Sequence, residues 1–170
     1  MLYIFGGLPG TGKSTLSAAL ASELRAAYLR VDVVEHAMRA AGVKVDGPEG
    51  YMVCYEIAKQ NLRIGLEVIA DTVNPIHITR QAWRSVAESL DIPFVEIEVV
   101  CSDEIEHRHR VTTRTTDIPG FTLPTWDEVE GRHYEAWDRD RIVIDTAHKS
   151  VDESLTELRE LLGLKSKIVK

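Results

Sequence analysis

The feature that most constrains this chain is a glycine-rich segment close to its beginning. Residues 7–14 read GLPGTGKS, a complete match to the pattern G-x-x-x-x-G-K-[ST]. The apolar residues 2–6 precede the segment and a run of helical period follows it, which is the strand–loop–helix context that the pattern requires. A turn that merely closes a strand–helix corner needs neither Lys13 nor Ser14. The segment therefore predicts a loop that binds the phosphates of a nucleotide.

The chemistry of the segment assigns a role to its individual positions. Glycines let the backbone curl, so that successive N–H groups point into one concavity at the positive end of the following helix. Lys13 is expected to reach the β- and γ-phosphates, and the Ser14 hydroxyl to bind Mg²⁺. The residues expected to hold the nucleotide are Gly7, Leu8, Pro9, Gly10, Thr11, Gly12, Lys13, Ser14 and Thr15. The segment alone leaves ATP and GTP open.

The rest of the chain alternates short apolar runs with longer stretches of helical period. This alternation is typical of βαβ units and a parallel sheet. Together with the phosphate loop, it predicts an α/β fold of the three-layer P-loop NTPase type, with a five-stranded parallel sheet flanked by helices. An arginine-rich lid is expected from the run at 106–114, described below. The expected strands are 2–6, 28–32, 67–71, 94–101 and 141–145. The expected helices are 13–26, 33–41, 51–66, 76–90, 102–114, 125–137 and 151–162.

Size and charge narrow the classes of protein that fit. A chain of 170 residues has room for one domain, which we expect to span 1–170 with a lid at about 103–124. The 27 acidic residues outnumber the 20 basic ones, and the net charge of −7 makes a nucleic-acid partner unfavourable. No apolar run approaches the ~18 residues that span a bilayer, and no basic leader opens the sequence. Cys54 and Cys101 form no CxxC pair, so we expect a reduced, cytoplasmic setting without membrane contact.

Two aspartates end expected strands, at the edge of a parallel sheet where ligands bind. Asp32 can accept the proton of an attacking hydroxyl, act on Mg²⁺, or serve as a helix N-cap that forms a capping box with Glu35. Asp71 is a candidate ligand of Mg²⁺ or its bound water; the alternative is a loop residue in an Asx turn. The sequence leaves open which of the two is the base.

An arginine-rich run, EHRHRVTTR at 106–114, is the candidate lid. Arg110 and Arg114 lie four residues apart and project from one helix face, whereas Arg108 points elsewhere. Guanidinium groups neutralise charge on a transferring phosphoryl group, and the alternative is an ordinary solvated helix face. We expect residues 110–124 to be mobile without nucleotide. Three histidines, expected on the surface or the lid rather than as metal ligands, are His107, His109 and His133.

The remaining sequence separates motors, switches and kinases. Little sequence is left after the expected sheet for the helical lid domain of a AAA-type motor. The Asn-Lys-x-Asp string by which GTPase switches read guanine does not occur. What fits is a small kinase, an enzyme that transfers a phosphoryl group to an alcohol group of a small-molecule acceptor. Two alternatives stay open: a nucleotide-binding module without a phosphorylated product, and a polynucleotide 5′-hydroxyl kinase.

In its order of features the chain resembles a group of small P-loop kinases. The group includes zeta toxins, chloramphenicol phosphotransferase, gluconate kinase, adenylylsulfate kinase and the kinase domain of polynucleotide kinase. The features that carry the resemblance are the loop at 7–14, Asp32, Asp71, the pair Arg110 and Arg114, and a last strand that ends in IDT at 144–146. The stretches 81–85 and 145–150 are most similar to chloramphenicol phosphotransferase.

The resemblance implies a donor and a set of site residues. ATP would be the donor, Asp32 the base, and Arg110 and Arg114 the lid arginines, with adenine near Thr146 and Ala147. One departure concerns the acceptor. Members that act on nucleotides often carry an arginine a few residues after the second-strand aspartate, and here positions 33–36 read VVEH. This absence argues against an anionic acceptor, and the aromatic and acidic residues at 51–56 suit a neutral or cationic one.

Overall fold

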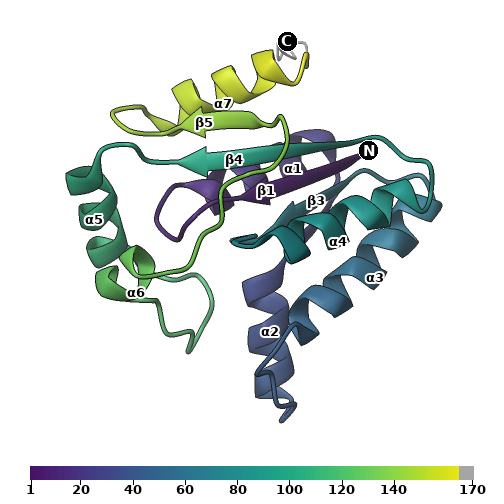
Figure 1. Cartoon of the computed structure of the whole chain (residues 1–170), viewed down its shortest axis with the longest axis horizontal. Helices are drawn as coiled ribbons and strands as arrows, with labels where there is room; N and C mark the ends of the chain where they lie inside the picture. The colour runs from purple at the N-terminus through teal and green to yellow at the C-terminus, as the bar shows by residue number, and fades with distance from the viewer. Residues whose placement is uncertain (165–170) are drawn as a thin grey trace.

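A five-stranded parallel sheet runs through the centre of the structure, a computed structural model that describes residues 1–164 (Figure 1). The strand order is β2-β3-β1-β4-β5. The strands are β1 (Leu2–Gly6), β2 (Ala27–Arg30), β3 (Val68–Asp71), β4 (Phe94–Val100) and β5 (Ile142–Asp145). Each pairs in parallel with its neighbours, so the expected five-stranded parallel sheet is confirmed.

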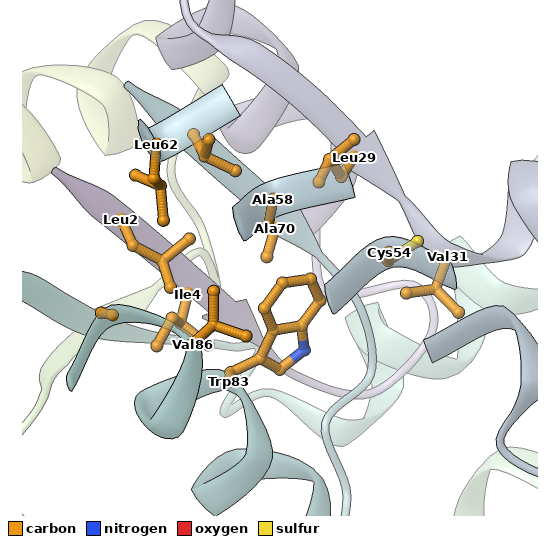
Figure 2. Packing of buried hydrophobic residues seen from close by; sticks show 12 residues of the cluster. Leu2, Ile4, Leu29, Val31, Cys54, Ala58, Leu62, Ala70, Trp83 and Val86 are labelled. Carbon is orange, nitrogen blue, oxygen red and sulfur yellow. The ribbon is translucent and has the colours of Figure 1, made fainter. Parts of the chain in front are cut away.

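Helices cover both faces of this sheet because the side chains of β1 alternate between the two faces. The helices are α1 (Lys13–Leu24), α2 (Val31–Ala40), α3 (Glu49–Arg63), α4 (His77–Glu88), α5 (Glu104–Thr113), α6 (Trp126–Glu130) and α7 (Val151–Leu161). Leu2 and Ile4 pack against α3 and α4 around the buried Trp83 (Figure 2). Tyr3 and Phe5 pack on the other face, against α1 and α7. These layers confirm the expected α/β class.

The second strand ends two residues earlier than the sequence suggested. β2 stops at Arg30, which pairs with Asp71 in the register of the sheet, and Asp32 already lies in the first turn of α2. The N-cap of α2 is Arg30, without a side-chain cap hydrogen bond, so the alternative interpretation of Asp32 as an N-cap in a capping box with Glu35 is wrong. Glu35 binds Arg39 one turn further along the helix instead. Asp32 instead places its charge near the positive end of α2.

The helix expected at 125–137 is also wrong in its second half, because α6 ends at Glu130. The reason lies in α4, whose Arg80 donates to the carbonyls of Glu135 at 2.7 Å and Ala136 at 2.9 Å. The N–H of Glu135 donates to the carbonyl of Pro75. These backbone groups therefore bind across the fold rather than within a helix, and residues 131–141 form a strap that leads to β5.

The described residues contain no helix that is both long enough and apolar enough to cross a membrane. Residues 165–170 of the expected domain lie outside the described residues. The helices α5 and α6 lie beyond the carboxyl end of β4, toward which its arrowhead points in Figure 1. Open α/β sheets bind their ligands at this carboxyl edge.

Candidate active site

A cavity of about 1180 Å³ opens at that edge. The P-loop forms one side of it, the end of β2 and the start of α2 form the second, and the segment from Arg110 to Arg132 forms the third. It brings together Lys13, Ser14, Asp32, Arg110 and Arg114, all of which were expected in the site. Its walls therefore combine a phosphate loop, a carboxylate and two arginines around one space.

The P-loop owes its shape to close approaches that side chains would prevent. Gly7 has a φ of 142°, and a Cβ there would lie 2.2 Å from the carbonyl oxygen of Val99 in β4. Gly10 has a φ of 88°, and its Cβ would lie 2.5 Å from the Val111 side chain of α5. Glycine is therefore required at both positions, once for the sheet and once for α5.

The loop ends at a helix N-terminus, as the motif predicts. Gly12 is the N-cap of α1, and the first amides bonded to its carbonyl are those of Thr15 and Leu16, both at 3.1 Å. The N–H groups of Lys13 and Ser14 precede these bonds and have no partner within the helix. Both residues line the cavity, so the N-terminal end of α1 offers it an anion site.

Lys13 forms a buried ion pair with Asp71, with 2.9 Å between Nζ and Oδ1. The hydroxyl of Tyr28 donates to the other oxygen of Asp71 at 2.6 Å. Burial alone would raise the pKa of Asp71, but the Lys13 ammonium and the hydrogen bonds hold it below its ordinary value. The expected Mg²⁺ role of Asp71 stays a prediction. Its carboxylate is charged and within reach of the P-loop lysine.

Tyr28 is a site residue that sequence reasoning missed. It lies on β2 and lines the cavity, and both burial and the Asp71 charge raise the pKa of its hydroxyl. The hydroxyl therefore stays protonated at neutral pH and can act as a donor. Its role depends on the pairing of β2 with β3, which brings Tyr28 beside Asp71. A single sequence does not show which strands pair.

Arg30 is the second residue that sequence reasoning missed. It ends β2, lines the cavity and holds Asp117, with Nη1 donating to both carboxylate oxygens at 2.9 and 2.8 Å. Its Nε lies 3.9 Å from Asp71 Oδ2. The arginine that the resemblance associates with the positions after Asp32 is absent at 33–36. The structure places an arginine in the site two residues before Asp32. A basic residue at the carboxyl end of an apolar strand was the available signal.

The two candidate lid arginines differ in their contacts. Arg110 donates to Thr146 at Oγ1 (2.7 Å) and at the carbonyl (2.9 Å), and it also binds Glu106. Arg114, by contrast, has buried Nε and Nη2 atoms without a hydrogen-bond partner among the described residues. Burial and the positive charge of Arg30 both lower the pKa of Arg114, against the pull of Asp32. Arg114 thus lines the cavity as a partly buried cation without a hydrogen-bonded anion among the described residues.

The helix α5, the candidate lid, is bound to the P-loop by His107, a residue expected on the surface or the lid. His107 is buried, its Nε2 lies 2.8 Å from the carbonyl oxygen of Pro9, and its ring meets Trp126 edge-on. The expectation of a surface position is wrong for His107, because its side chain fills the space above Gly10. The two remaining histidines and the off-face arginine are exposed, and these are His109, His133 and Arg108.

The residues expected near adenine lie behind the P-loop. Thr146 is buried, and its hydroxyl is 2.8 Å from the carbonyl oxygen of Thr11. Ala147 follows it, and its N–H donates to Asp145. Neither Thr146 nor Ala147 is among the described residues that line the cavity. Arg110 donates a hydrogen bond to Thr146. Their role with adenine stays a prediction.

Comparison with known proteins places this geometry among characterised families. A family model described as an AAA domain matches residues 2–133. The adenylyl-sulfate kinase of Staphylococcus epidermidis is 30% identical over 166 residues, which cover 91% of this chain and 79% of that protein. A putative kinase from Chloroflexus aurantiacus shares the fold with a TM-score of 0.71 at 21% identity, covering 95% of each chain.

A further solved structure contains ligands. The Mycobacterium tuberculosis APS kinase in complex with AMPPNP and APS has a TM-score of 0.70 at 21% identity, covering 95% of this chain and 96% of that one. The family match spans the P-loop, the sheet from β1 to β4 and both candidate lid arginines. On this evidence the chain belongs to the AAA-domain family, and within it to the small P-loop kinases, ATP-binding phosphotransferases that act on small molecules.

Proposed function

We propose that this protein transfers the γ-phosphate of ATP, with Mg²⁺, to a hydroxyl group of a small molecule, and that Asp32 is the base. The observation that carries the proposal is the arrangement around the cavity. The P-loop and Asp32 belong to different elements but line one space, with Arg114 on the third side. Such an arrangement allows a hydroxyl to lie between a carboxylate and a bound phosphate.

On the donor side, this chain supplies donors for phosphate oxygens. The N-terminal amides of α1 and the Lys13 ammonium are suited to the β- and γ-phosphates. The Lys13 ammonium is bound to Asp71 in this structure, so nucleotide binding requires this ammonium to be shared between the Asp71 carboxylate and the phosphates. Ser14 Oγ would hold Mg²⁺, and the metal supplies charge neutralisation on the phosphate oxygens.

On the acceptor side, Asp32 receives the proton of the hydroxyl as its oxygen bonds to the γ-phosphorus. The bond from that phosphorus to the bridging oxygen of ADP breaks, and ADP leaves with the electron pair. Arg114 stabilises the charge on the transferring group, since its unpartnered N–H groups are already desolvated. Arg110, α5 and the segment to Pro124 form the lid in this proposal.

The experiment that tests the proposal compares two carboxylates of the same cavity. Asp32→Asn should leave ATP affinity nearly unchanged and lower kcat by ~10²–10⁴, the range for a positioned general base. Asp127→Asn is the matched control, because Asp127 also lines the cavity but is exposed on α6. ADP formation is measured with ATP, Mg²⁺ and a panel of hydroxyl compounds. Equal turnover of Asp32→Asn and the control would contradict the base assignment.

Two P-loop variants test the donor side. Lys13→Ala should abolish turnover with every acceptor, and it also leaves Asp71 without its cation, so the melting temperature is recorded alongside. Ser14→Ala keeps the Lys13–Asp71 pair and should lose the Mg²⁺-dependent rate alone. Tight ATP binding with no acceptor-dependent ADP across broad panels would favour a nucleotide-binding module. Labelling of oligonucleotide 5′ ends would favour a polynucleotide kinase.

A further inference from the structure

Arg30 is held in a way that leaves part of its guanidinium unused. Its side chain is only 18% exposed, and its Nε is buried without a hydrogen-bond partner, 3.9 Å from Asp71. Among the hydrogen bonds of residues 1–164, those of the Arg30 guanidinium come from Nη1 alone, and both go to the carboxylate of Asp117. The guanidinium therefore presents its outer edge to an anion, in the geometry with which arginine binds carboxylate, phosphate and sulfate.

The anion that Arg30 now holds belongs to a weakly anchored segment. Asp117 lies in the irregular stretch between α5 and α6, and its side chain is 74% exposed. Arg30 is the one cationic partner recorded for this carboxylate within residues 1–164. Exposed ion pairs of this kind contribute only ~0.2–1 kcal/mol, so a second oxyanion can displace Asp117 at little cost.

A second cation stands close to the same place. Nε and Nη2 of Arg114 are buried without a hydrogen-bond partner among the described residues, and the charges of both Asp32 and Arg30 act on its guanidinium. Both side chains line the cavity. Like charges in a partly desolvated wall repel, and an anion bound by both guanidinium groups would relieve the repulsion and supply hydrogen-bond acceptors. Asp117 satisfies Nη1 of Arg30 and none of the orphaned atoms of Arg114. The Asp117 carboxylate thus satisfies only part of the hydrogen-bonding capacity of the two arginines.

Arg30 and the proposed base share one wall. Arg30 and Asp32 are two residues apart at the junction of β2 and α2, and both line the cavity. One small molecule can therefore present a hydroxyl to Asp32 and a separate charged group to Arg30. The other arginine of this wall, Arg39, is half exposed and already paired with Glu35 at 3.1 Å, so it does not compete for the role.

We propose that Arg30, assisted by Arg114, forms an oxyanion site for the acceptor, and that Asp117 of this chain occupies it until the acceptor arrives. The proposal rests on the proposed function and narrows its substrate class. The acceptor is a hydroxyl compound that also carries a carboxylate, phosphate or sulfate group. Displacement of Asp117 by the acceptor then releases the 114–125 segment from β2, and Arg30 determines specificity without touching the transferred phosphate.

The first experiment measures sulfate binding directly. Protein saturated with ADP and Mg²⁺, which fill the anion site of the P-loop, is titrated with sulfate while the Arg30 Nε–Hε resonance is followed by NMR. We expect saturable binding that Arg30→Gln weakens more than tenfold. Asp117→Asn should tighten it about 1.4- to 5-fold, the factor equivalent to an exposed ion pair of ~0.2–1 kcal/mol. Arg39→Gln, the matched control, should bind as the wild type does.

The result that overturns the proposal is equally specific. Sulfate binding that is absent, or is identical in Arg30→Gln, Asp117→Asn and the control, means that Arg30 and Asp117 form only a structural contact. Arg30→Gln could lose the fold, and its melting temperature is therefore measured first. Asp117→Asn changes an exposed side chain alone, so the predicted gain in affinity stays decisive even then.

The second experiment compares matched acceptors by ADP formation. The pairs are gluconate with glucose, glucose 6-phosphate with glucose, and adenylyl-sulfate with adenosine, so carboxylate, phosphate and sulfate are tested separately. The anionic member of at least one pair should be used at least tenfold better, and Arg30→Gln should raise its KM while Asp117→Asn lowers it. Turnover of neutral members alone, unaffected by Arg30→Gln, refutes this inference but keeps the proposed function. Sulfate binding at Arg30 without any acceptor-dependent ADP refutes the proposed function instead.

Discussion

Two pairs of arginines in this molecule differ in how their donors are used. In α4, Arg80 donates to four backbone carbonyls, and Arg84 donates to the carboxylates of Glu96 and Asp138. Both side chains are fully buried. Around the cavity, Nε of Arg30 and both Nε and Nη2 of Arg114 are buried without a hydrogen-bond partner in the part of the chain that the structure describes. The first pair holds the strap at 131–141 against the sheet, and the second faces open space.

The difference teaches which arginines belong to the fold and which to the ligand. A buried guanidinium with every donor satisfied is a structural connector, because its removal leaves partners unpaired within the protein. One with orphaned donors that face a cavity is destabilising as it stands, and it gains its partners only when an anion binds. Mutation should separate these two classes, with stability lost in one and catalysis in the other.

The largest expected effect is on stability, at Arg84. Arg84→Ala leaves Glu96 buried without its hydrogen-bonded cation, since Arg84 Nε donates to both of its oxygens at 3.0 Å. Breaking a buried pair in this way should lower the free energy of unfolding by about 3–5 kcal/mol, measured by urea denaturation. Arg108→Ala, on an exposed surface of α5, is the control and should change it by less than about 0.5 kcal/mol.

A compensating change sharpens this prediction. Glu96→Gln added to Arg84→Ala removes the stranded charge and should recover part of the lost stability. Residual turnover per folded molecule should match the wild type, because Arg84 does not line the cavity. A stable Arg84→Ala variant with impaired turnover would reverse the distinction between the two arginine pairs.

The next effect is on catalysis, at Arg114. Arg114→Ala should lose about 2–4 kcal/mol of transition-state stabilisation, in line with removal of one preorganised donor, as measured by kcat/KM. Its free energy of unfolding should be unchanged or slightly raised, because the variant removes buried donors that have no partner. Unchanged catalysis with a destabilised fold would show that Arg114 is a structural residue and that the lid lies elsewhere.

The features that the sequence predicted correctly are those that depend on residues close together in the chain. Residues 2–6 and 68–71 are apolar runs between turns, and the P-loop carries its own pattern, so their strands, loop and helix needed no tertiary information. The parallel sheet followed from the alternation of such runs with helices. Local signals also placed Lys13, Asp32 and Arg114 at the same edge of the sheet.

The features that it missed depend on contacts between distant segments. Tyr28 became a site residue through the register of β2 beside β3, and His107 became buried through its contact with Pro9. The second half of the helix expected at 125–137 does not form, because the carbonyls of Glu135 and Ala136 accept hydrogen bonds from Arg80. Arg30 shares this cause, since its partner Asp117 lies 87 positions away in the chain. Periodicity and motif spacing contain none of these pairings.

The smallest expected effect concerns the titration of Asp117, and it tests whether Arg30 and Asp117 form their ion pair in solution. The hydrogen bonds from Arg30 hold the pKa of Asp117 below its ordinary value, in opposition to a small effect of burial. Because the charged form is the paired form, the contact is complete above the ordinary aspartate pKa of about 3.9 and is lost as the pH falls through the lowered value. Its contribution to stability should be only ~0.2–1 kcal/mol, since the carboxylate is largely exposed.

Carboxyl NMR titration of Asp117 measures this directly. The pKa should return toward the ordinary aspartate value in Arg30→Gln and stay lowered in Arg39→Gln, which leaves the contact intact. An anion that displaces Asp117 should have the same effect as Arg30→Gln, because it takes the same donors. If Asp117 titrates normally in the wild type, Arg30 has no resident carboxylate in solution. Its whole guanidinium would then face the cavity in the same unpaired state as Arg114.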